Sequence, residues 1–534
     1  MYKTMLQAMC SRGLQALRLL FLSSLTLPAL SGTARAALLG PVTTDSGSLV
    51  GVASPEPSVT AFKGVPYGAS TAGAARWRPP RPPTPWHTPR RADHFGAECP
   101  QVPRNMPGRD DLPQSEDCLF LNVWTPARSP TDHLPVMVWI HGGAYIFGSG
   151  ANYDGWRDPS GLAAQGVVLV TFNHRLGIFG YFAHPALAEE SPHHSAGNYG
   201  VLDVIAALRW VHQNIAAFGG DPGNVTIFGH SSGSGIVTIL LAAPQAHGLF
   251  QRAIAESGAT LGFRSPKPLA VAMAEGAAFA RTVGALSIAD LRARPAKSLV
   301  SPKPGAFEPV VDGWLYPRSL YQTLSAGHGD EVPLLVGSTS DEGQYSLSVT
   351  AQSYIEEMHR RYGAAAAEVL ARYPATSDEI ARRSSAAVDT LEQDAILTTL
   401  ADLANCAPRR DGLPRVFQYR FEHAPPRQAN DRRQGAYHGA EIPYVFHALS
   451  NEPRAWTKID RRLEHLLSSY WVNFARTGDV NGPGLPHWPS LREQPGAMMR
   501  FGENARAVTG RTNASGIMLL QRIYYGAPVR QCDR

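Results

Sequence analysis

Apolar residues are arranged along the chain in two kinds of segment. Short apolar or β-branched runs, which are typical of buried strands, occur at residues 135–140, 166–172, 225–228, 253–258, 332–336 and 416–421. Apolar residues recur at helical spacing within 205–218, and again from Tyr354 to about Leu403. We therefore predict strands at the short runs, a helix over 205–218 and helices packed outside the sheet over 354–403. Alternation at 38–52 predicts an N-terminal hairpin, and 416–421 is the last strong strand signal.

The first 36 residues have the features of a targeting segment. Lys3, Arg12 and Arg18 precede an apolar stretch over 19–30, and Ala34-Arg35-Ala36 provides the small residues at which signal peptidase cuts. The apolar stretch is shorter than the roughly 18–20 residues that a membrane-spanning helix needs. We expect a signal peptide over 1–36, cleaved after Ala36, which leaves no membrane anchor. The protein is then secreted or periplasmic.

Composition excludes several classes of function. The chain has 534 residues and is 44% hydrophobic, as ordinary globular proteins are, which allows two or three average domains or one large α/β domain. The formal net charge is +5, but the Lys and Arg residues are scattered among Pro, Asp and Glu, so we expect no nucleic-acid binding. No metal-ligand cluster, P-loop or dinucleotide-binding motif occurs, and the sequence therefore implies no cofactor and no metal.

The strand predicted at 225–228 leads directly into Gly229-His230-Ser231-Ser232-Gly233. A serine hydroxyl becomes a useful nucleophile when it stands on a sharp strand-to-helix turn beside a base, and such a turn requires small flanking residues. Gly229 and Gly233 provide that space. The spacing GxSxG alone is a weak signal, but here it follows a predicted strand and precedes a renewed apolar pattern, so Ser231 is a candidate nucleophile.

A second glycine-rich turn follows the strand predicted at 135–140. Its residues are His141-Gly142-Gly143-Ala144-Tyr145. Small residues after a buried strand allow backbone N–H groups to point at an oxyanion, because no side chain blocks the approach. A Gly-Gly pair after a strand is often only a turn, and this motif gains its meaning from the Ser231 turn.

Several motifs together resemble the type-B carboxylesterase and cholinesterase family, including its bacterial para-nitrobenzyl-esterase-like members. The matching segments are 115–124, 141–145, 218–235, 435–446 and 470–479, and the likeness covers essentially everything after residue 36. The resemblance implies an α/β-hydrolase fold: a central, mostly parallel β-sheet flanked by helices, with an N-terminal hairpin and helical insertions. Residues 37–534 would then form a single domain.

The resemblance also implies a catalytic triad in the chain order of this fold. Ser231 is the expected nucleophile, and His438 in the segment 435–446 is the expected base. Two adjacent carboxylates, Asp341 and Glu342, follow the strand predicted at 332–336, where the acid is expected, and the family pattern favours Glu342. We interpret the other histidines near these motifs, His141, His230 and His447, as structural.

Further roles come from the same resemblance. The expected oxyanion-hole donors are the backbone amides of Gly143, Ala144 and Ser232. Ser257 matches a family serine that can hydrogen-bond near the triad acid, and Arg175 and Asp203 are expected to form a structural ion pair. For the disulfides we expect Cys99 with Cys118, and by resemblance to some relatives Cys406 with Cys532.

The expected function is that of an exported serine carboxylesterase acting on a small-molecule ester through an acyl-enzyme. The alternative is a catalytically silent, cholinesterase-like binding or adhesion protein, which an intact set of catalytic residues disfavours. A choline ester is not expected, because Gly108 stands where cholinesterases keep a tryptophan and His230 where they keep a glutamate. Neutral esters are the expected substrates, and the charges of Arg104 and Arg109 keep carboxylate-bearing esters as an alternative substrate class.

Overall fold

The computed structural model describes residues 38, 40–102, 112–151, 158–300, 307–329, 331–343, 346–406, 415–428 and 433–529. Contacts divide the chain into two compact units, Met1–Arg35 and Ala36–Arg534, and every described residue belongs to the second. The predicted signal peptide therefore lies outside the described residues, as do Arg104, Gly108, Arg109 and Cys532.

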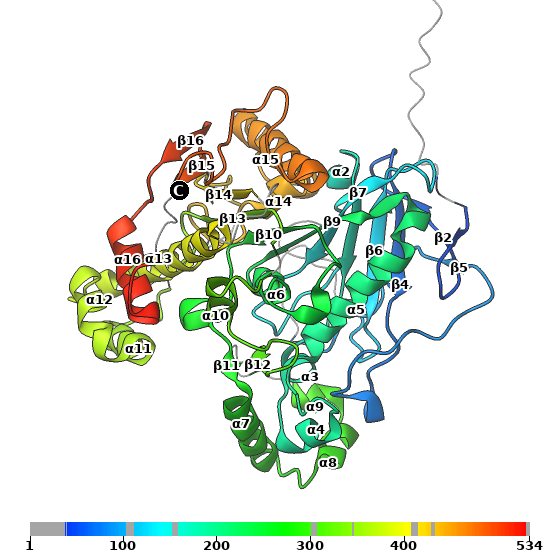
Figure 1. The fold of residues 1–534 in the computed structure, drawn as a ribbon, viewed down its shortest axis with the longest axis horizontal. Coiled ribbons are helices and arrows are strands. Elements are labelled where there is room, and N and C mark those ends of the chain that lie inside the picture. Colours follow the sequence, from blue (N-terminus) through cyan, green and yellow to red (C-terminus); the bar gives the residue numbers. More distant parts are fainter. Residues whose placement is uncertain are drawn as a thin grey trace, which may run out of the picture. The chain divides into compact units, whose positions relative to one another are not determined.

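A sheet of eleven strands forms the centre of the second unit, in the order β16-β15-β14-β13-β10-β9-β7-β8-β6-β4-β3 (Figure 1). The strands are β3 (Val52–Ala53), β4 (Thr60–Pro66), β6 (Phe120–Thr125), β7 (Leu134–Ile140), β8 (Val168–Phe172), β9 (Gly220–His230), β10 (Arg252–Glu256), β13 (Leu334–Thr339), β14 (Val416–Phe421), β15 (Ala497–Phe501) and β16 (Ala505–Thr509). Neighbours from β15 through to β8 run parallel, and the pairs at the two ends are antiparallel. The predicted mostly parallel sheet is confirmed.

The N-terminal hairpin is also present. β1 (Val42–Thr43) pairs antiparallel with β2 (Ser48–Val50), and β5 (Arg90–Arg91) joins them in a small separate sheet. A third small sheet consists of β11 (Lys267–Pro268) and β12 (Val310–Val311). The prediction that 416–421 is the last strong strand missed β15 and β16. Polar residues interrupt both segments, and β16 is an edge strand with its side chains largely exposed, so neither has the uninterrupted apolar run of a buried strand.

Helices cover both faces of the sheet. They are α2 (Ser160–Ala163), α3 (Gly177–Tyr181), α4 (Pro185–Glu190), α5 (Tyr199–Asn214), α6 (Ser232–Leu240), α7 (Leu269–Thr282), α8 (Ile288–Ala293), α9 (Ala296–Leu299), α10 (Leu320–Ser325), α11 (Ala351–Tyr362), α12 (Ala366–Arg372), α13 (Asp378–Asn405), α14 (Ile442–Val445), α15 (Lys458–Thr477) and α16 (Ala514–Tyr525). No helix in the described ranges combines the length and the apolar character needed to cross a membrane.

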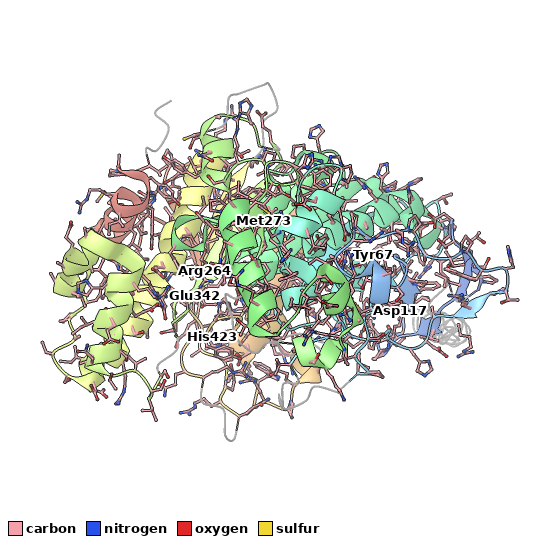
Figure 2. The ribbon with its side chains drawn as sticks, turned by 90° about the horizontal axis from the view of Figure 1, so that it is seen from below. Tyr67, Asp117, Arg264, Met273, Glu342 and His423 are labelled. Carbon is pink, nitrogen blue, oxygen red and sulfur yellow. A yellow bond between two sulfur atoms is a disulfide. The ribbon has the colours of Figure 1, made fainter. Side chains whose placement is uncertain are left out.

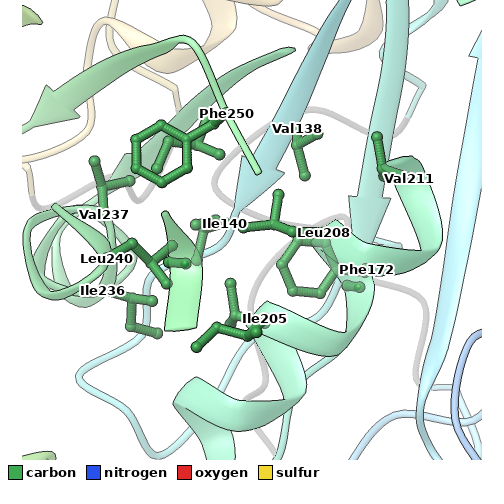
Figure 3. Close-up of a cluster of buried hydrophobic side chains, with 14 of the residues drawn as sticks. Val138, Ile140, Phe172, Ile205, Leu208, Val211, Ile236, Val237, Leu240 and Phe250 are labelled. Carbon is green, nitrogen blue, oxygen red and sulfur yellow. The ribbon is translucent and has the colours of Figure 1, made fainter. Parts of the chain in front are cut away.

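The core is divided by the alternation of side chains along the strands. Val138 and Ile140 of β7 pack with apolar residues of α5 and α6 on one face (Figure 3). Met137 and Trp139 point to the other face, among apolar residues of α14 and α15. Complete burial of an aliphatic side chain stabilises the fold by about 1.5–3 kcal/mol, so both faces hold the sheet firmly. This rigid sheet carries the turns that form the site.

Helix α5 begins earlier than predicted. The apolar spacing predicted 205–218, whereas the α-helix runs from Tyr199 to Asn214 and a 3-10 turn continues to Phe218. Gly200 obscures the start because glycine is a poor helix former, but its lack of a side chain is required: a Cβ there would lie 2.6 Å from the carbonyl oxygen of Arg175. Arg175 forms the predicted ion pair with Asp203 of this helix, at 2.7 Å and fully buried.

Candidate active site

Ser231 stands on a sharp turn between β9 and α6. Its backbone has φ +58° and ψ −123°, a conformation that non-glycine residues rarely adopt, and its N–H donates a hydrogen bond to the carbonyl oxygen of Glu256 at 2.9 Å. The neighbouring glycines are required by space. A Cβ on Gly233 would lie 2.0 Å from the carbonyl oxygen of Ile140, and one on Gly258 would lie 2.2 Å from that of Ser231. The sequence therefore permits a tight turn that only glycine can accommodate at these points.

His438 and Glu342 are brought together across the end of the sheet. Glu342, labelled in Figure 2, follows β13 by three residues, and its Oε2 is hydrogen-bonded to Nδ1 of His438. Asp341 has a different position: its Oδ2 accepts the N–H of Ala436 at 2.9 Å, and its own N–H donates to the carbonyl oxygen of Ala436 at 3.1 Å. Asp341 thus braces the loop that carries the histidine, and Glu342 contacts the histidine ring.

The carboxylate of Glu342 is held in place by further donors. Its Oε1 accepts the hydroxyl of Ser257 at 2.6 Å and the N–H of Thr339 at 2.8 Å. Burial acts to raise the pKa of Glu342, but the charge of His438 and the hydrogen bonds from His438, Ser257 and Thr339 lower it to about 2. Glu342 is therefore ionised at any pH at which the protein is expected to work, and both of its oxygens are occupied.

The turn after β7 presents unused backbone donors beside Ser231. Gly143 and Ala144 have φ of +113° and +51°, and a Cβ on Gly143 would lie 1.9 Å from the carbonyl oxygen of Phe147. The N–H of Tyr145 donates to Oγ of Ser232 at 3.2 Å, which ties this turn to the Ser231 turn. In the hydrogen bonds of the described residues, the N–H groups of Gly143, Ala144 and Ser232 donate to no acceptor. These three amides can bind an oxyanion.

His230 contacts the predicted catalytic histidine, which the sequence interpretation of His230 as an ordinary structural residue did not foresee. The rings of His230 and His438 lie 4.3 Å apart between centroids, and His230 is fully buried. Burial, reinforced by the nearby charge of His438 and opposed by that of Glu342, holds the pKa of His230 well below its ordinary value. His230 is therefore neutral and packs against the His438 ring. In the sequence, only the position of His230 next to Ser231 indicated that it could lie near the site.

Two further buried carboxyl groups, those of Glu441 and Glu256, lie near Glu342, and no sequence pattern predicted either. Glu441 Oε1 accepts the hydroxyls of Tyr419 at 3.3 Å and Ser257 at 3.4 Å. Burial, together with the charges of Glu342 and Glu256, raises the pKa of Glu441 well above its usual range. Burial also raises the pKa of Glu256 to about 8, against the hydrogen bond that it accepts from Trp471 Nε1 at 2.6 Å. Near neutral pH, Glu342 is the charged member of this group.

The protonation of Glu256 predicts a dependence of stability on pH. Its folded pKa of about 8 exceeds the ordinary glutamate value of 4.5, so at pH values between the two the folded state binds more protons than the unfolded state. Stability should therefore fall as pH rises through this window, by on the order of 3 kcal/mol between about pH 5 and pH 8. Urea unfolding of the protein and of Glu256→Gln measures it. Identical pH slopes for the two proteins would contradict the assignment.

The predicted first disulfide joins Cys99 to Cys118, with 5.0 Å between the Cα atoms. It closes a loop between β5 and β6. Cys406, just after α13, is also disulfide-bonded, but the predicted partner Cys532 lies outside the described residues, so the second pairing stays a prediction. Within the described ranges, no three His, Cys, Asp or Glu residues are grouped as a metal site requires.

Comparisons with known proteins agree with this geometry. The chain matches the model of the carboxylesterase family over residues 40–517. It is 36% identical over 489 residues to the fumonisin B1 esterase of Sphingopyxis macrogoltabida, and the matched residues cover 88% of this chain and 87% of that relative. It is 35% identical over 479 residues to the para-nitrobenzyl esterase of Bacillus subtilis strain 168, covering 85% and 93%. A solved PNB esterase structure has a TM-score of 0.77 at 31% identity, covering 91% of this chain and 99% of that one.

The fold is that of an α/β-hydrolase, as predicted. The chain belongs to the carboxylesterase family, and the protein is a carboxylic ester hydrolase. The family resemblance predicted from the sequence motifs is thereby confirmed.

Proposed function

We propose that the protein is an exported serine esterase that works through an acyl-enzyme, with Ser231, His438 and Glu342 as its catalytic triad. The observation that carries the proposal is the hydrogen bond between His438 and Glu342 at the end of the sheet that also carries the Ser231 turn. In such a triad the carboxylate fixes the tautomer of the imidazole, and the imidazole activates the serine. Residues 37–534 act as one domain in this proposal.

The geometry supports the following sequence of steps. Oγ of Ser231 attacks the acyl carbon while Nε2 of His438 takes its proton, and Glu342 stabilises the resulting imidazolium. The oxyanion of the tetrahedral intermediate accepts hydrogen bonds from the amides of Gly143, Ala144 and Ser232. His438 returns the proton to the departing alcohol, which leaves the acyl group on Ser231. Water then attacks the acyl carbon while His438 takes its proton. When the bond to Oγ breaks and the carboxylic acid is released, His438 returns that proton to Oγ of Ser231.

Export is the second part of the proposal. It rests on the basic residues, apolar stretch and small residues of 1–36. The disulfide between Cys99 and Cys118 is compatible with an oxidising compartment outside the cytoplasm. Mass spectrometry of the N-terminus of the protein recovered from the periplasm or medium tests this part. A mature chain that begins at Ala37 is expected, and an intact Met1 there would contradict it.

The expected activity is hydrolysis of small neutral esters. The names of two relatives, fumonisin B1 esterase and para-nitrobenzyl esterase, point to organic esters as the substrate class. The direct test is release of chromophore from a short-chain para-nitrophenyl ester by the purified protein. Rapid, saturable hydrolysis is expected. Hydrolysis no faster than in buffer would instead favour a silent protein that keeps only the fold.

Choline esters are expected to be poor substrates. A quaternary ammonium group is bound by aromatic faces and nearby negative charge. The residue before the nucleophile is the buried, neutral His230, and no aromatic residue occurs between Cys99 and Cys118. We expect butyrylcholine to have no advantage in kcat/KM over its neutral isostere 3,3-dimethylbutyl butyrate. A tenfold preference for the choline ester, about 1.4 kcal/mol in transition-state binding, would overturn this expectation.

Esters that carry a carboxylate are a second candidate class. Arg104 and Arg109 favour such substrates by charge, although both lie outside the described residues. Asp110, Asp111, Glu116 and Asp117 follow in the same loop and oppose the attraction. Comparison of kcat/KM for a neutral ester and for its analogue with a terminal carboxylate distinguishes the two classes.

A further inference from the structure

The middle of helix α13 contacts the segments that hold Glu342, although its sequence pattern suggested only helix packing. Oγ1 of Thr390 accepts the N–H of Gly343 at 3.1 Å. Nε2 of Gln393 donates to the carbonyl oxygen of Ser257 at 3.1 Å. Oδ1 of Asp394 accepts the hydroxyl of Ser338 at 3.0 Å. About one turn of this helix thus bonds both to the end of β13, which leads to Glu342, and to the turn after β10, which carries Ser257 (Figure 1).

Ser257 links these contacts of α13 to the carboxylate of Glu342. Its φ of +52° is unfavourable for a non-glycine residue, so its backbone needs partners that hold it. Its N–H donates to the carbonyl oxygen of Gly337 at 2.8 Å, and its carbonyl accepts from Gln393. With both sides of the backbone fixed, the hydroxyl reaches Oε1 of Glu342 at 2.6 Å. The strained backbone and the hydrogen bond to Glu342 depend on each other.

The hydrogen bonds of Gln393 indicate that its donor group is what matters. Gln393 is 4% exposed, and its Oε1 accepts no hydrogen bond among the described residues. A buried amide oxygen without a donor is costly, so an apolar side chain of similar size would suit this position better if packing were its only task. What an apolar side chain cannot supply is the bond from Nε2 to Ser257.

We propose that Gln393 is a positioning residue that keeps Ser257 on Glu342 and thereby orients Glu342 toward His438; this rests on the proposed function of the triad. Without the Nε2 donor, Ser257 can relax toward an ordinary φ, and its hydroxyl then leaves Oε1 of Glu342. The carboxylate loses one of the bonds that set its direction, and the imidazole loses its alignment with Ser231. Gln393 is buried and acts through Ser257 in this proposal, so the loss is expected to fall on kcat and to leave KM unchanged.

A double-mutant cycle tests the proposal. The variants are Gln393→Met, Ser257→Ala and the double variant, assayed for kcat and KM with a chromogenic neutral ester. We expect Gln393→Met to lower kcat roughly tenfold with KM within about twofold. The double variant should lie within about twofold of Ser257→Ala alone, because Gln393 acts through Ser257.

Gln418→Met is the matched control. Gln418 of β14 is also 4% exposed and also bonds to α13, from Nε2 to Oγ1 of Thr398 at 3.1 Å. In the hydrogen bonds of the described residues, Gln418 has none to Ser257. Its variant should lose thermal stability much as Gln393→Met does while keeping kcat within about twofold of the unmodified protein. Should Gln393→Met fail to fold, Gln393→Leu provides the same comparison.

The possible outcomes are distinct. Multiplied losses in the double variant, or an equal loss of kcat in Gln418→Met, would show that Gln393 acts only through general stability and would overturn the inference while the proposed esterase stands. Absence of ester hydrolysis by the unmodified protein would overturn the proposed function and this inference with it. Non-multiplied losses confined to kcat would support both.

Discussion

Replacing Glu342 with glutamine should lower kcat for ester hydrolysis by roughly 10⁴-fold, the effect of the corresponding change in a serine protease triad. Glu342 is hydrogen-bonded to Nδ1 of His438. In the proposed triad this bond leaves Nε2 of His438 to take the proton of Ser231. A glutamine amide can instead donate to Nδ1, and the imidazole then carries its proton on Nε2. A protonated Nε2 cannot accept the proton of Ser231. Steady-state kinetics with a chromogenic ester measure the loss, and circular dichroism checks the fold.

Asp341→Asn is the matched control for Glu342→Gln. Asp341 is the adjacent carboxylate, and its Oδ2 accepts the N–H of Ala436, a bond that an asparagine oxygen can also accept. We expect kcat within a few-fold of the unmodified protein. A large loss in Asp341→Asn together with a small loss in Glu342→Gln would mean that the wrong carboxylate was assigned to the triad.

Ser231→Ala should remove nearly all activity, with kcat lower by roughly 10⁶-fold, as when a serine nucleophile is deleted in subtilisin. The remaining rate would come from the oxyanion amides and from binding. The backbone at Ser231 has the same φ demand for alanine as for serine, so the fold should persist, and its melting temperature should change little. The comparison uses the same ester and protein concentration for both proteins.

Ser232→Ala separates the two adjacent serines. The proposed role of Ser232 is its backbone N–H, which the substitution keeps, while among the described residues its Oγ accepts only the N–H of Tyr145, at 3.2 Å. We expect a loss of no more than about tenfold, because the amide donor remains while the link between the two turns is weakened. Equal losses of kcat in Ser231→Ala and Ser232→Ala would argue against Oγ of Ser231 as the nucleophile.

The sequence was most informative where chemistry and backbone shape coincide. Gly229 and Gly233 predicted the sharp turn at Ser231, and the space around them in the fold accounts for both glycines. The buried strands of the parallel sheet were predicted from their apolar runs. Strands β15 and β16 were missed because Arg500 interrupts the short apolar run of β15 and because β16 is an exposed edge strand that needs no such run. Their positions depend on the pairing of β15 with β14 and of β16 with β15, which no local pattern encodes.

The residues behind the site were missed for a related reason. Glu256 lies in β10, Gln393 in α13 and Glu441 just before α14, and their contacts arise only through the packing of the sheet against the helices. Each looks ordinary in its own segment, and a buried glutamate cannot be distinguished from an exposed one by its neighbours in the sequence. His230 contacts His438 across more than 200 positions of the chain, so this contact too arises only in the folded protein.

Covalent labelling with a fluorophosphonate tests the central claim most directly. Such reagents phosphonylate an activated serine and imitate the tetrahedral intermediate, so labelling does not depend on the natural ester. We expect one phosphonyl group per chain, located by peptide mass spectrometry on Ser231, with ester hydrolysis lost in proportion to labelling and no adduct in Ser231→Ala. An adduct on another residue, or full hydrolysis by the fully labelled protein, would contradict the account.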